Sequence, residues 1–241
     1  MYSYFTRVRY SETDMGGRLT ETALLDYLQD TAIFHAEDLG YSIQYMSDNN
    51  IVWVLGAWQI NIKELPLIGE EIRIDTYPYR FKGFVGCRSF RILSKDGSKE
   101  YANANSVWSL INTETMRPEK VPQSMVDAFL DDDIEIDNIG KKIRVPDDVD
   151  YHKMDDIVIT PHYLDTNNHV NNAQYVYIAR EYIADVCGDK KTISRIRAEY
   201  KKQIFLGNIL KPRVCVDGEI VLVVFEDEDD KIATIVEFVI R

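Results

Sequence analysis

The sequence has 241 residues, 45% of them hydrophobic, and a formal net charge of −12 at pH 7. Its length allows one or two domains with an apolar core, and no stretch approaches the roughly 20 apolar residues of a membrane span. The negative charge disfavours a nucleic-acid partner, because duplex binding relies on Lys and Arg to neutralise phosphates. The three cysteines have no short spacing, which predicts reduced thiols. The first ten residues lack the pattern of a secretory signal, so we expect a cytoplasmic protein.

The first half of the chain predicts a strand, a long helix and a set of antiparallel strands. Residues 5–10 read as the first strand. A helical apolar stripe then continues until Gly40, carried by Leu24, Leu25, Leu28 and Ala32. The next strand begins near residue 58 and ends near Gly69, and further strands are expected at 72–77, 86–93 and 102–112. Alternation in 72–77 predicts one buried and one wetter face.

Residues 116–150 read as a crossover linker with a short helix near 125–130. The second half then repeats the order of the first. A strand at 157–163 precedes a helical pattern that ends at Gly188, and strands follow at 194–207, 213–216, 219–225 and 232–240. A helix with an apolar stripe packs onto a sheet with one apolar face. The sequence therefore predicts an α+β tandem double hotdog, in which each half is a long helix packed on an antiparallel β-sheet.

The loops that enter the two long helices form the most informative repeat. The first reads Asp14-Met-Gly-Gly-Arg-Leu-Thr and the second Asp165-Thr-Asn-Asn-His-Val-Asn. Asn and Asp in such loops are explained by helix capping alone. His169 is harder to explain structurally, because histidine titrates near neutral pH and suits proton transfer. The adjacent helix N-terminus offers N–H groups to a carbonyl oxygen that becomes an oxyanion.

The second loop resembles the signature of a known family. Asp165-x-Asn167-x-His169-Val-Asn-Asn, followed by a helix containing Tyr175, is similar to the loop of the acyl–acyl carrier protein thioesterases of plastids and bacteria. Segments 106–112, 117–122 and 198–204 also resemble that family in order along the chain. The resemblance implies hydrolysis of fatty acyl-[acyl-carrier-protein] to a free fatty acid, which terminates fatty acid synthesis. It also implies Asp165, Asn167 and His169 as catalytic residues.

One departure bears on the mechanism. Where plant members carry Glu-Cys, this chain has Gln203 and Ile204, which excludes a cysteine nucleophile at that point. Gln203 could orient water without taking its proton, and Glu199 is a second auxiliary candidate, although a salt bridge to its basic neighbours is the simpler use. Asp165 is then either the nucleophile or the base for a water, with His169 orienting it or protonating the leaving thiolate.

The resemblance also divides the chain by role. It implies an acyl-binding domain at 1–130, a linker at 131–150 and a catalytic domain at 151–241. The acyl-pocket candidates, with ordinary sheet core as the alternative reading, are Trp53, Leu55 and Trp58. Basic residues in an otherwise acidic chain are candidates for docking the acidic acyl carrier protein, with solvated strand edges as the alternative; they are Lys190, Lys191, Arg195, Arg197, Lys201 and Lys202. We expect no cofactor and no metal, and the sheet edges allow a homodimer.

Three other functions remain open from the sequence. An acyl-CoA thioesterase would use the same chemistry on another carrier. A hydratase or dehydratase would share the fold, which does not fix function, but its site does not resemble this loop. A non-catalytic acyl-thioester binding module would not need the Asp, Asn and His together.

Overall fold

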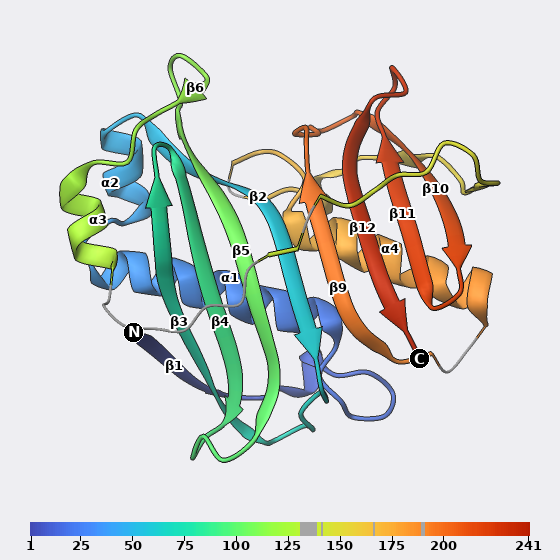
Figure 1. The fold of residues 1–241 in the computed structure, drawn as a ribbon, viewed down its shortest axis with the longest axis horizontal. Helices are drawn as coiled ribbons and strands as arrows, with labels where there is room; N and C mark the ends of the chain where they lie inside the picture. Colours follow the sequence, from blue (N-terminus) through green and yellow to red (C-terminus); the bar gives the residue numbers. More distant parts are fainter. Residues whose placement is uncertain (131–138, 141, 166, 189–190) are drawn as a thin grey trace. The chain divides into compact units, whose positions relative to one another are not determined.

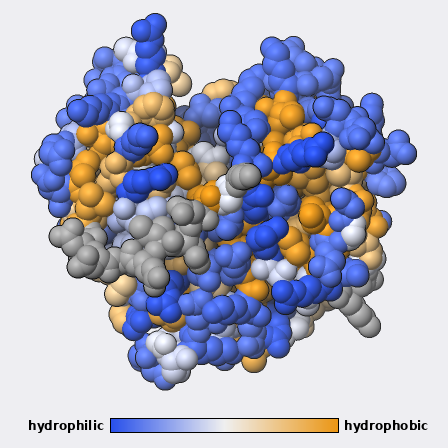
Figure 2. All heavy atoms as spheres, in the orientation of Figure 1, coloured by the Kyte–Doolittle hydropathy of each residue, from blue (hydrophilic) through white to orange (hydrophobic). Residues whose placement is uncertain are grey.

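The computed structural model describes residues 1–130, 139–140, 142–165, 167–188 and 191–241. They form two compact units, Met1–Gly56 with Ile60–Ile139 and Ala57–Gln59 with Gly140–Arg241. Each unit contains one long helix and an antiparallel sheet (Figure 1). Hydrophilic side chains cover most of the face seen in Figure 2, with apolar areas between them.

The first unit begins with a strand and a long helix and continues with the sheet. Its elements are β1 (Tyr2–Arg7), a 3-10 turn (Tyr10–Glu12), α1 (Glu21–Asp38), α2 (Ile43–Asp48), β2 (Ile51–Ile62), β3 (Glu71–Lys82), β4 (Val85–Ser94), β5 (Glu100–Asn112), β6 (Arg117–Pro118) and α3 (Gln123–Phe129). The strand order is β1-β3-β4-β5-β2. Helix α1 starts at the N-cap Thr20, whose side chain accepts the Ala23 N–H, and Gly40 follows its end with a φ of 82°.

The second unit repeats this plan. Its elements are β7 (His152–Lys153), β8 (Ile157–Val158), a 3-10 turn (Pro161–Tyr163), α4 (Asn172–Cys187), β9 (Ile193–Tyr200), β10 (Ile209–Asp217), β11 (Ile220–Glu226) and β12 (Ile232–Ile240). The order is β9-β12-β11-β10-β7, and β8 also pairs with β10. Gly188 caps α4 with a φ of 75°, as the sequence predicts for a helix stop.

In both units the core lies between the helix and one face of the sheet. Helix α1 contacts β3, and α4 contacts β12. Leu24 and Leu28 of α1 are at most 1% exposed, as are Val176 and Ala179 of α4. The predicted helix-on-sheet arrangement of the two halves is confirmed.

Several predicted boundaries are wrong, and prolines account for two of them. Strand β2 ends at Ile62 rather than continuing to Gly69: the Lys63 and Glu64 N–H groups both donate to the Tyr101 carbonyl, and Pro66 has no N–H with which to resume the ladder. The strand expected at 157–163 stops at Val158 and gives way to the turn that begins at Pro161. The strand expected at 5–10 likewise ends at Arg7. The short linker helix is present as α3.

The alternation predicted for 72–77 also fails at two positions. Tyr77, expected on the wetter face, is 6% exposed. Asp75, expected on the same face, is 2% exposed. The Ser3 hydroxyl donates to its carboxylate at 2.6 Å, and the Arg73 Nε lies 3.0 Å away. Pairing of β1 with β3 therefore covers this carboxylate and satisfies it. The domain limits at 130 and 150 stay predictions, and the acidic part of the linker lies outside the described residues.

Candidate active site

The loop between the Pro161–Tyr163 turn and α4 brings Asp165 and His169 together. The loop closes on itself because the Asp165 N–H donates to the His169 carbonyl at 2.9 Å. The Asn167 N–H donates to Asp165 Oδ1 at 2.8 Å, which fixes the carboxylate. The other oxygen, Oδ2, then lies 3.4 Å from His169 Nδ1. A carboxylate and an imidazole are thus held side by side by local backbone geometry.

The orientation of the imidazole follows from its second neighbour. His169 Nδ1 is also 3.3 Å from the Val170 carbonyl oxygen. Because a carbonyl oxygen only accepts hydrogen bonds, Nδ1 carries the hydrogen, and Nε2 of the neutral ring keeps a lone pair. The side chains of His169 and Asp165 are 15% and 17% exposed, so the pair is shielded but still reachable.

The asparagines of the loop behave differently from one another. Asn171 is the N-cap of α4, and its Oδ1 accepts the Ala173 N–H at 2.9 Å. This N–H of the first turn is therefore not available to a substrate oxygen. Asn167 is exposed, and only its backbone contacts Asp165. The structure brings Asp165 and His169 together but does not place the Asn167 side chain against them.

The segment after β9 lies beside this loop. The Val170 N–H donates to the Ile204 carbonyl at 2.9 Å, and the backbones of His169 and Phe205 form an isolated antiparallel β-bridge. Ile204 is buried, and Gln203 is half-buried, with no side-chain hydrogen bond to the described residues. No thiol stands here: Cys87 and Cys215 are buried, and Cys187 ends α4.

Glu199 is already engaged elsewhere. Its Oε1 accepts the Ile143 N–H at 2.6 Å, and its Oε2 lies 3.1 Å from Lys201 Nζ. The salt bridge foreseen in the sequence is present, and the carboxylate also anchors the linker. Both oxygens are therefore occupied by structural contacts.

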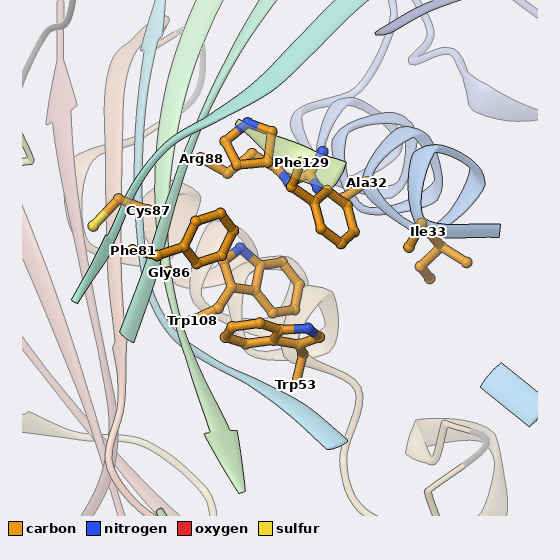
Figure 3. A pocket seen from close by; sticks show the side chains of 11 residues that line it. Ala32, Ile33, Trp53, Phe81, Gly86, Cys87, Arg88, Trp108 and Phe129 are labelled. Carbon is orange, nitrogen blue, oxygen red and sulfur yellow. The ribbon is translucent and has the colours of Figure 1, made fainter. Parts of the chain in front are cut away.

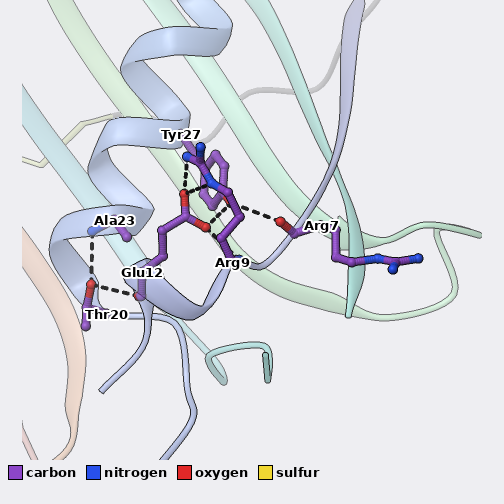
Figure 4. A network of polar contacts seen from close by, with 6 residues as sticks. All are labelled: Arg7, Arg9, Glu12, Thr20, Ala23 and Tyr27. Carbon is purple, nitrogen blue, oxygen red and sulfur yellow. Dashed lines mark hydrogen bonds and ion pairs between the residues drawn. The ribbon is translucent and has the colours of Figure 1, made fainter. Parts of the chain in front are cut away.

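The corresponding loop of the first unit has the same backbone but different chemistry. The Asp14 N–H donates to the Arg18 carbonyl at 2.8 Å, as Asp165 does to His169. Asp14 Oδ1 accepts two backbone N–H groups, and no imidazole stands at Arg18. Nearby, Glu12 accepts hydrogen bonds from Arg9 and Tyr27 (Figure 4). Burial and this hydrogen bond raise the pKa of Tyr27 to about 12.

The first unit instead contains an apolar cavity of about 110 Å³ (Figure 3). Of the three acyl-pocket candidates, only Trp53 lines it; Leu55 and Trp58 are each 2% exposed and belong to the core. Aromatic residues that the sequence analysis did not single out complete the wall; they are Phe81, Trp108 and Phe129.

Arg88 also lines the cavity and was missed from the sequence. It is 8% exposed, and burial lowers the pKa of its guanidinium to about 9, so it remains charged at neutral pH. Its position in the strand could have indicated this burial. Arg88 is two residues before Phe90 and four before Ile92, so its side chain lies on the same, buried face of β4.

Most of the basic docking candidates have acidic partners. Arg195 and Arg197 lie 3.6 and 3.3 Å from Glu237 on the neighbouring strand. Lys201 pairs with Glu199 as described above, and Lys202 pairs with Asp227. Lys191 is exposed, and Lys190 lies outside the described residues. The local positive charge read from the sequence is thus largely neutralised.

Two further properties concern only the described part of the chain. No group of three or more His, Cys, Asp or Glu residues there could hold a metal ion. No helix among those residues is both long and apolar enough to cross a membrane.

Solved structures with the same fold include two acyl-ACP thioesterases. The enzyme from Bacteroides thetaiotaomicron superposes with a TM-score of 0.87 at 24% identity, covering 99% of this chain and 97% of that one. The 12:0-ACP thioesterase from Umbellularia californica gives 0.85 at 20% identity, covering 100% and 96%. Together with the tandem helix-on-sheet units, these similarities define a double hotdog protein.

Family models identify the lineage more narrowly. Residues 1–129 match the acyl-ACP thioesterase N-terminal domain, and residues 147–234 match the C-terminal domain. The chain belongs to the acyl-ACP thioesterase family. A chloroplastic acyl-[acyl-carrier-protein] hydrolase of Cuphea viscosissima is 27% identical over 210 residues, which cover 80% of this chain. The chain spans about half the length of the plant relatives that it matches.

Proposed function

We propose that the protein hydrolyses the thioester of fatty acyl-[acyl-carrier-protein] and releases a free fatty acid. The observation that carries this proposal is the contact between the Asp165 carboxylate and the His169 imidazole, in a chain that belongs to this family. A second observation supports the division of labour, since the apolar cavity lies in the first unit and the Asp–His pair in the second.

The proposed reaction breaks the C–S bond and adds the elements of water. In one route Asp165 takes a proton from a water that attacks the carbonyl carbon. In the other its carboxylate attacks first, and water hydrolyses the resulting anhydride. In both routes the leaving thiolate receives a proton from His169, which first gains that proton at Nε2 from solvent, because the neutral ring carries its hydrogen on Nδ1. Asn167 would act only after turning its exposed side chain toward the bound carbonyl. Gln203 is the remaining candidate for orienting water.

Matched variants of the two loops test the site. We expect Asp165→Asn and His169→Ala to lower kcat by roughly 100-fold or more, because each removes a proton-transfer group. Asp14→Asn is the control, since it changes the equivalent carboxylate of the first loop. Hydrolysis by the purified protein would be followed by release of free thiol. A normal rate in Asp165→Asn would overturn the assignment.

An isotope experiment separates the two routes. A single turnover in ¹⁸O-labelled water leaves label in Asp165 only when an acyl anhydride forms on it and water attacks the Asp165 carbonyl. Label found solely in the fatty acid, together with trapping of no acyl-enzyme by hydroxylamine, assigns Asp165 as the base.

The pairing of the basic residues favours a second candidate, an acyl-CoA thioesterase. Neutralised arginines and lysines offer less attraction to an acidic carrier protein. The same acyl chain presented on acyl carrier protein and on coenzyme A distinguishes the two. Equal kcat/KM on both carriers would favour the coenzyme A activity.

A further inference from the structure

Arg88 is a buried cation whose hydrogen-bond partners are neutral. Its Nη1 lies 3.1 Å from His35 Nδ1 and 3.2 Å from Thr76 Oγ1. The Phe129 ring packs 5.6 Å from the guanidinium carbon. Because Nη1 donates to Nδ1, this nitrogen of His35 is an acceptor and the imidazole is neutral. Among the residues that the structure describes, no carboxylate forms an ion pair with Arg88.

An unpaired buried charge favours binding of an opposite charge. Burying a cation without a counter-ion is costly, and folding has already removed most water from this guanidinium. An incoming anion therefore needs to lose only its own hydration. Arg presents donors in a planar fork that matches the two oxygens of a carboxylate.

The surroundings of Arg88 define the rest of the ligand. Apolar side chains of Ala32, Ile33, Trp53 and Phe81 line the cavity beside the guanidinium (Figure 3). A single water needs about 10–15 Å³ of such cavity space, so the 110 Å³ cavity has room for a carboxylate and several methylenes. The cavity is open at its mouth, through which the remainder of a chain would leave.

This chemistry matches the product of the proposed reaction better than its substrate. The methyl end of an acyl thioester offers nothing to a buried guanidinium, whereas a free fatty acid carries one carboxylate on an apolar chain. We propose that the cavity beside Arg88 binds a free fatty acid carboxylate-first, with the guanidinium holding the head group and the apolar walls holding the first methylenes. Only the choice of a fatty acid as ligand rests on the proposed function.

Occupancy by the released acid would block acyl-chain entry into the same cavity. The enzyme would then be inhibited competitively by its own product, with Arg88 setting the strength of that inhibition. Such feedback links the rate of release to the local concentration of free fatty acid.

Equilibrium binding to the intact chain at pH 7 tests the site directly. The probes are dodecanoate and dodecanol, which share the chain and differ in the head group, at concentrations below micelle formation. Tryptophan fluorescence reports occupancy, because Trp53 and Trp108 line the cavity. We expect dodecanoate to bind roughly tenfold or more tightly than dodecanol, as for a charge-assisted hydrogen bond. Equal affinity of the unaltered protein for dodecanoate and dodecanol would overturn the proposal. A carboxylate from elsewhere in the chain that neutralised Arg88 would give this result.

Substitutions assign the preference to the guanidinium. Arg88→Met keeps the approximate length and removes the charge, so the preference for dodecanoate should disappear while dodecanol still binds. Arg88→Lys should restore part of the preference. Arg80→Met is the matched control, because Arg80 lies on the adjacent strand and is exposed. If folded Arg88→Met protein, judged by cooperative thermal unfolding, still preferred dodecanoate to the same extent, Arg88 would not be the residue that binds the carboxylate.

Hydrolysis measurements keep the two proposals apart. Carboxylate-selective binding without any thioesterase activity would remove the proposed function and leave the fatty acid site standing. Thioesterase activity that dodecanoate inhibits no better than dodecanol would remove the fatty acid site and leave the proposed function standing.

Discussion

At the scale of single residues, the loop that holds Asp165 and His169 depends on one unusual backbone conformation. Asn168 has a φ of 61°, and Gly17 occupies the equivalent position of the first loop with a φ of 71°. This left-handed region disfavours side chains other than glycine, although Asn tolerates it. The conformation turns the chain so that the carbonyl of His169 can accept the Asp165 N–H. The Asp–His contact is therefore a consequence of loop geometry as well as of residue type.

Substitution at Asn168 tests this dependence. We expect Asn168→Gly to retain stability and hydrolysis, because glycine already serves at the equivalent position. Asn168→Ala should lower the free energy of unfolding by about 1 kcal/mol, because alanine lacks the polar side chain whose local hydrogen bonding lets asparagine adopt the left-handed region. Urea denaturation of the two variants measures the difference. Identical midpoints for both would mean that the loop relaxes to another conformation.

At the scale of elements, a cluster around Glu100 joins neighbouring strands of the first sheet. Lys63 Nζ lies 2.8 Å from Glu100 Oε1, and Arg91 Nη2 lies 2.9 Å from Oε2. Burial raises the pKa of the carboxyl, but hydrogen bonds from Lys63, Asn103 and Arg91 outweigh it and lower that pKa to about 2. The carboxylate thus ties β5 to β4 and to the end of β2.

The sign of this shift gives a pH-dependent prediction. Because the folded-state pKa lies below the ordinary value of 4.5, the stabilisation is fully present above that value and is lost as the pH falls toward about 2. Glu100→Gln should therefore lower the urea midpoint at pH 7. The deficit should shrink steadily below pH 4.5. A deficit of the same size at pH 7 and pH 2.5 would contradict the ionic origin.

At the scale of the molecule, both units have the same fold, but only the second has an Asp–His pair in the loop before its long helix. Both loops share their backbone hydrogen bonds, yet only the second combines a carboxylate with an imidazole. The first unit contributes the apolar cavity. The chain as a whole carries a charge of −12, and four of the basic docking candidates pair with carboxylates, which weakens the attraction of this region for an acidic carrier.

Among the docking candidates that the structure describes, Lys191 is exposed and forms no ion pair with another described residue. We expect Lys191→Glu to raise KM for an acyl chain on acyl carrier protein by a few-fold at low salt, because repulsion slows encounter. The effect should fade near 0.5 M salt, as screening at roughly this concentration suppresses exposed charges. KM for the same chain on coenzyme A serves as the control. An equal rise on both carriers would argue against a docking role for Lys191.

The sequence by itself determined the two long helices, the short linker helix, most strands, the internal repeat and the Asp–His loop of this protein; helix α2 was not predicted. These features are local: periodicity, glycine stops and residue spacing are all present within about 20 neighbouring residues. The contact between Asp165 and His169 was predictable because residues four positions apart in one tight loop cannot be far apart in space.

Only the tertiary structure decided what depends on distant partners. Phe129 of the linker helix packs against Arg88 of β4, and Glu237 of β12 neutralises Arg195 and Arg197 of β9. Such contacts join segments separated by about 40 residues, and no local pattern encodes them. Burial makes Arg88, one basic residue among many in the sequence, a charge in an apolar cavity without a carboxylate partner among the described residues, and removal from water changes what a charged group can bind.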